Sequence, residues 1–79
     1  MLLRPVSFHV LQIGAHWEVS CTLRDRAVTR HPDRLSALLA AETAAILLWE
    51  QQQVTSEVAI CEDDGEWHTV ARFGGLLDR

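Results

Sequence analysis

The stretch DRLSALLAAETAAILLWEQ, residues 33–51, decides the fold because it is a helix candidate that is apolar on nearly every side. On a helical wheel at about 100° per residue, its apolar side chains form two stripes bridged by Leu38. The first stripe consists of Ala37, Ala41, Ala44, Ala45 and Leu48, and the second of Leu35, Leu39, Ile46 and Trp49. The only coherent polar strip consists of Ser36, Thr43, Glu50 and Gln51, with Glu42 alone inside the apolar arc. A helix that is apolar this far round has to be covered on two sides.

The length of the chain limits what can cover that helix. Seventy-nine residues make one domain, and we expect a tail over residues 1–5, the domain over 6–74 and a second tail over 75–79. A domain of this size buries only about 60% of its unfolded surface, and oligomerisation is a common remedy. We therefore predict a homodimer with the second stripe at the seam.

Four other segments are expected to be strands, two on each side of the helix. Val6–Ile13 and Trp17–Leu23 alternate in polarity and should form an antiparallel hairpin, although the alternation fails at Leu11, where a bulge or two-sided burial is expected. Glu57–Glu62 and Trp67–Phe73 flank Asp64-Gly65, a strong hairpin signal. The predicted fold is α+β, ββαββ, with a mainly antiparallel four-stranded sheet and one helix on one face.

The segment before the helix and the faces of the helix complete this picture. Arg24 to His31 is expected to be a loop, with a short strand extension at Ala27-Val28 as an alternative, and Asp33 is the expected N-cap. Small side chains at Ala37, Ala41 and Ala45 should let the helix approach a sheet face that carries Trp17, Val19 and Ile60. Leu35, Leu39, Ile46 and Trp49 would then point outward, where an apolar stripe marks an interaction surface. An alternative for Trp49 is that it folds over the sheet edge and covers Val54.

Charge is divided between two regions of the chain. The basic region carries Arg24, Arg26, Arg30 and Arg34, the acidic one Glu57, Glu62, Asp63, Asp64 and Glu66. The simplest explanation of this charge segregation is two solvated loops of opposite sign. The functional alternative is head-to-tail docking between subunits, or an anion bound by the arginines. A net charge of -4 disfavours nonspecific nucleic-acid binding. The absence of Lys leaves Arg, the better residue for bidentate pairing with carboxylates or phosphates, as the only basic side chain besides His.

No motif for metal binding or catalysis is found in the sequence. Metal-ligand spacings, a nucleophile elbow and a glycine-rich phosphate loop are all missing. His9 or His68 near Cys61 or Glu57 would be the one conceivable metal cluster, and Cys21 with His9 or His16 the one conceivable nucleophilic pair. We expect no enzyme activity, cofactor or metal, and free thiols at both cysteines.

The order and spacing of these elements resemble a family of small bacterial proteins catalogued as a domain of unknown function, the 2188 type. The similar pieces are Phe8-His9-Val10, Trp17-Glu18-Val19, the alanines at Ala37, Ala41 and Ala45, Glu57-Val58-Ala59-Ile60, Asp64-Gly65-Glu66-Trp67 and Phe73-Gly74. The resemblance implies the ββαββ fold and no known activity, so it assigns no functional residues. This chain departs from the family in having no Lys and an apolar residue at Leu35 on the outer helix face.

The expected function is that of a non-enzymatic interaction module that forms a homodimer. The alternative is a small acidic inhibitor or regulator of the phage type, which would block a site on a larger protein or nucleoprotein complex. A weaker alternative is a nucleic-acid binder that uses the Arg24–Arg34 loop. Met1 to Pro5 lacks the long apolar core of a signal peptide and no segment is long enough to span a bilayer, so a cytoplasmic bacterial or phage protein without membrane contact is expected.

Overall fold

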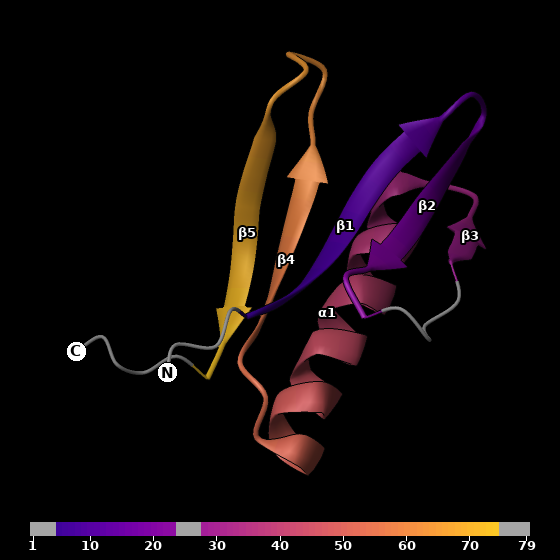
Figure 1. Cartoon of the computed structure of the whole chain (residues 1–79). Coiled ribbons are helices and arrows are strands. Elements are labelled where there is room, and N and C mark those ends of the chain that lie inside the picture. Colours follow the sequence, from indigo (N-terminus) through magenta and orange to yellow (C-terminus); the bar gives the residue numbers. More distant parts are fainter. Residues whose placement is uncertain (1–4, 24–27, 75–79) are drawn as a thin grey trace.

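One helix packs on one face of a five-stranded mixed sheet (Figure 1). The computed structural model describes residues 5–23 and 28–74, so the two expected tails, apart from Pro5, lie outside the described residues. The elements are β1 Val6–Ile13, β2 His16–Cys21, β3 Thr29–His31, α1 Arg34–Gln52, β4 Ser56–Cys61 and β5 Trp67–Phe73. The strands lie in the order β3-β2-β1-β4-β5. The α+β class is confirmed.

The predicted four-stranded sheet differs from the structure in two respects, although three of the four strand pairings that the structure describes are antiparallel. At the centre of the sheet β1 and β4 run parallel, with Phe8 opposite Val58, because α1 connects the two hairpins and returns the chain to the same end of the sheet. A fifth strand, β3, pairs antiparallel with β2 and places His31 opposite Trp17. This strand lies in the expected loop; with only three residues it has no apolar alternation to reveal it.

The helix begins as the sequence predicts. The carboxylate of Asp33 accepts the backbone N–H of Ser36 at 2.8 Å, which satisfies one free donor of the first turn and confirms Asp33 as the N-cap. This hydrogen bond also holds the pKa of the Asp33 carboxyl below its usual value. At the other end Gln53 adopts a left-handed conformation, φ 57°, and its N–H donates to the carbonyl of Trp49.

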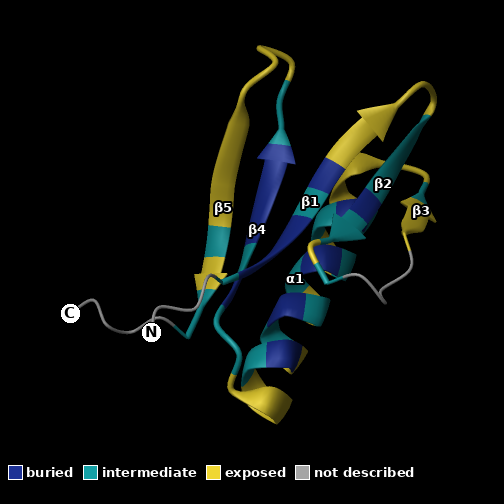
Figure 2. Ribbon diagram, viewed as in Figure 1, coloured by how far each residue is buried: buried dark blue, intermediate teal, exposed yellow. Residues whose placement is uncertain are grey.

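The core lies between the alanine stripe of α1 and the central strands. Ala37, Ala41 and Ala45 are fully buried, as the sequence predicts, and the sheet opposes them with apolar residues. These residues are Val6, Phe8, Val10, Val19, Val58 and Ile60. The short alanine side chains bring the helix backbone close enough for buried Ser56 to donate its hydroxyl to the carbonyl of Ala45 at 2.7 Å. Figure 2 shows this burial concentrated on β1, β4 and the inner side of α1, whereas β3 and most of β5 are exposed.

The irregularities of the sheet are not where the sequence places them. Leu11 stays in regular register opposite Glu18, so the bulge or two-sided burial expected there is wrong. Its side chain is partly exposed because it lies on the sheet face away from α1. The register shift occurs instead between β4 and β5, beside Val58 and Ala59. The Asp-Gly turn forms the expected hairpin, with Gly65 at φ 81°.

Candidate interaction surface

The outer face of α1 carries the most exposed large apolar side chains of the described chain. Leu35 is 66% exposed and Leu39 is 54% exposed, as the second stripe predicts. Ile46 is half-buried at the margin of this face. Leu47, which is 44% exposed, also belongs to it although the sequence analysis did not include it, because the wheel places Leu47 among the polar residues. Its spacing of eight residues from Leu39 is the signal that would have found it.

The exposed leucines share one continuous row of the helix surface. Leu35, Leu39, Thr43, Leu47 and Gln51 follow one another at intervals of four residues, and all five are exposed. We call this set the outer row. Rows at this spacing form the ridges by which helices pack against one another. The outer row itself contains no charged residue, and the exposed Glu50 lies beside it, seven residues from Thr43 on the same side of the helix.

Trp49 takes a different place from the exposed leucines. It is half-buried, and its indole lies against Gly74 at the end of β5. A Cβ at Gly74 would collide with this ring, and Gly74 also has φ 91°. The indole therefore contributes to packing within the domain, similar to the alternative in which Trp49 folds over the sheet edge. Its role in partner contact stays a prediction.

The basic and acidic regions meet within one chain. Arg34, in the first turn of α1, donates to the carboxylate of Glu62 at 2.8 Å. Arg30 on β3 lies 3.6 Å from the carboxylate of Glu18. Arg24 and Arg26, the other candidates for anion or partner contact, lie outside the described residues. Among the described arginines of the candidate anion site, each thus has a carboxylate partner in its own chain.

The sheet face away from α1 is mixed in character. The Glu57 carboxylate accepts hydrogen bonds from the hydroxyl of Ser7 at 2.6 Å and from Arg72 at 3.1 Å. Beside this cluster the rings of His9 and Trp67 lie 5.1 Å apart, tilted by 51°. Glu57 on this face is thus already paired within the domain, and the exposed apolar side chains Leu11, Ile13 and Trp67 are less exposed than Leu35 and Leu39.

The histidines and cysteines do not form the combinations that the sequence left open. Cys21, on β2, lies on the α1 side of the sheet and Cys61, on β4, on the opposite side; β1 lies between these two strands, and both cysteines are free thiols. His9 alternates with Phe8 and so faces away from Cys21. Across residues 5–23 and 28–74, no three His, Cys, Asp or Glu side chains gather as a metal site.

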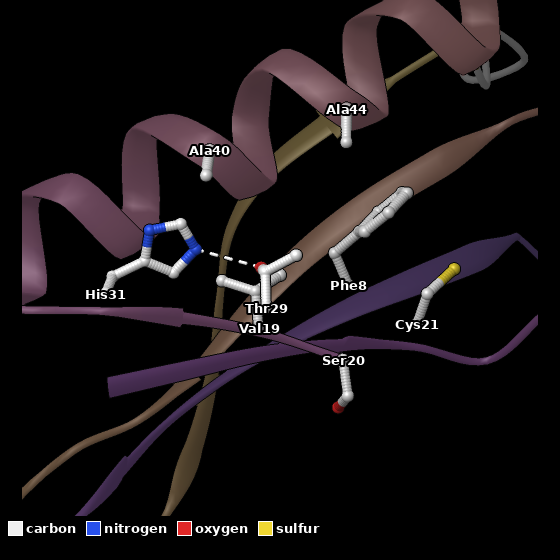
Figure 3. A pocket seen from close by; sticks show the side chains of 8 residues that line it. All are labelled: Phe8, Val19, Ser20, Cys21, Thr29, His31, Ala40 and Ala44. Carbon is white, nitrogen blue, oxygen red and sulfur yellow. Dashed lines mark hydrogen bonds between the residues drawn. The ribbon is translucent and has the colours of Figure 1, made fainter. Parts of the chain in front are cut away.

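A small pocket lies between α1 and the β2–β3 edge (Figure 3). It is lined by Phe8, Val19, Ser20, Cys21, Thr29, His31, Ala40 and Ala44. In Figure 3 the side chain of Ser20 points away from it, and a hydrogen bond of 2.9 Å joins His31 to the hydroxyl of Thr29. Its volume of about 190 Å³ is below the range of about 300–1,000 Å³ that is usual for ligand sites. We therefore take the outer face of α1 as the candidate site.

No helix of the described chain is long and apolar enough to cross a membrane. Comparison with known proteins finds no matching family model, no similar curated protein and no similar solved structure. The resemblance to the 2188 type stays a prediction.

Proposed function

We propose that this chain is a non-enzymatic interaction module that forms a homodimer through the outer face of α1. The exposure of the outer row is the observation that carries the proposal. Leu35, Leu39 and Leu47 are exposed by 66%, 54% and 44%, although the other side of the same helix already fills the core. A monomer leaves these side chains in water, whereas a second copy would remove them from it.

The expected affinity follows from the same exposures. Full burial of a leucine contributes about 2 kcal/mol, so three leucines a little over half exposed contribute about 3 kcal/mol per copy and about 6 kcal/mol per dimer. Association itself costs about 4–15 kcal/mol, because the two molecules lose independent translational and rotational freedom. Ile46 and the methyl group of Thr43 add apolar contact, but the surplus stays small. We therefore expect weak association, which shows only at high protein concentration.

The experiment is the solution mass of wild type and of a Leu35→Glu, Leu39→Glu double variant, by light scattering at several concentrations. Wild type should rise from monomer towards dimer with concentration. The double variant should remain a folded monomer because a seam would bury four carboxylates. Leu11→Glu is the control, since it places one such carboxylate at a partly exposed leucine on the opposite face of the domain, and it should leave association unchanged.

Other results would contradict the proposal. A wild type that stays monomeric at millimolar concentration would exclude the homodimer. The alternative function, a small inhibitor that occupies a site on a larger protein, would then be favoured. A double variant that still dimerises would show that the seam lies elsewhere than on the outer face.

We place the module in the cytoplasm because its two cysteines lie on opposite faces of the sheet as free thiols, the usual state in a reducing compartment.

A further inference from the structure

We draw no further inference here: the strongest candidate, the small pocket between α1 and the β2–β3 edge, has mainly apolar walls, and nothing in the described part of the chain shows what fills it.

Discussion

Replacing Leu39 by Ala separates association from folding. Leu39 is 54% exposed in the monomer, so a seam would bury just over half of a side chain whose full burial contributes about 2 kcal/mol. The loss is about 1 kcal/mol per copy and about 2 kcal/mol per dimer, which raises the Kd about 30-fold. The effect on unfolding is smaller, under about 1 kcal/mol, because Ala has the higher helix propensity and the side chain is already half in water.

The assay for Leu39→Ala combines sedimentation equilibrium with urea unfolding at a concentration where wild type is monomeric. Leu11→Ala is the control, because Leu11 is 36% exposed on the sheet face away from α1, and its Kd should equal that of wild type. An unchanged Kd for Leu39→Ala would refute the proposed seam. If the Kd rises equally in both variants, the substitutions weaken association by destabilising the folded monomer and not by removing a contact at the seam.

Three further predictions concern the fold that presents the outer row. Ser56→Ala should lower the free energy of unfolding by about 1 kcal/mol in urea titrations, since the bond to Ala45 is lost; no change would mean that the bond is not formed. Gly74→Ala should lower the melting temperature, because Ala disfavours φ 91° and its Cβ would displace Trp49; Gly14→Ala, where a Cβ meets no neighbour but φ is 61°, isolates the backbone part. Below about pH 4 wild type should lose stability more steeply than Asp33→Asn. The pKa of Asp33 is lowered in the folded state, so its contribution is present above the ordinary pKa and lost as the pH falls through the folded value; equal acid titrations would contradict this.

The parts of the fold that depend on local pattern could be predicted from the sequence. Asp33 caps a helix because its side chain reaches a nearby N–H, and the Asp64-Gly65 turn closes a hairpin because Gly65 tolerates positive φ. The alanine spacing predicted which side of α1 faces the sheet. Each of these depends on residues close together in the sequence or on one helical or strand period.

The relation between the two hairpins could not be predicted in this way. Whether β1 pairs with β4 is decided by the path of α1 and by how Phe8 and Val58 pack, and neither leaves a local signal. The three residues of β3 are held by pairing with β2 more than by their own apolar pattern. In the candidate site, Leu47 was missed because the wheel places it among polar residues, and the contact of Trp49 with Gly74 joins segments that are distant in sequence.

The most direct test of the account is sedimentation equilibrium of the wild-type chain from about 1 μM to about 1 mM. The account predicts a weight-average mass that begins at 8.9 kDa and rises towards twice that value at the highest concentrations, because association buries the outer row. A mass that stays at 8.9 kDa over the whole range would contradict the homodimer.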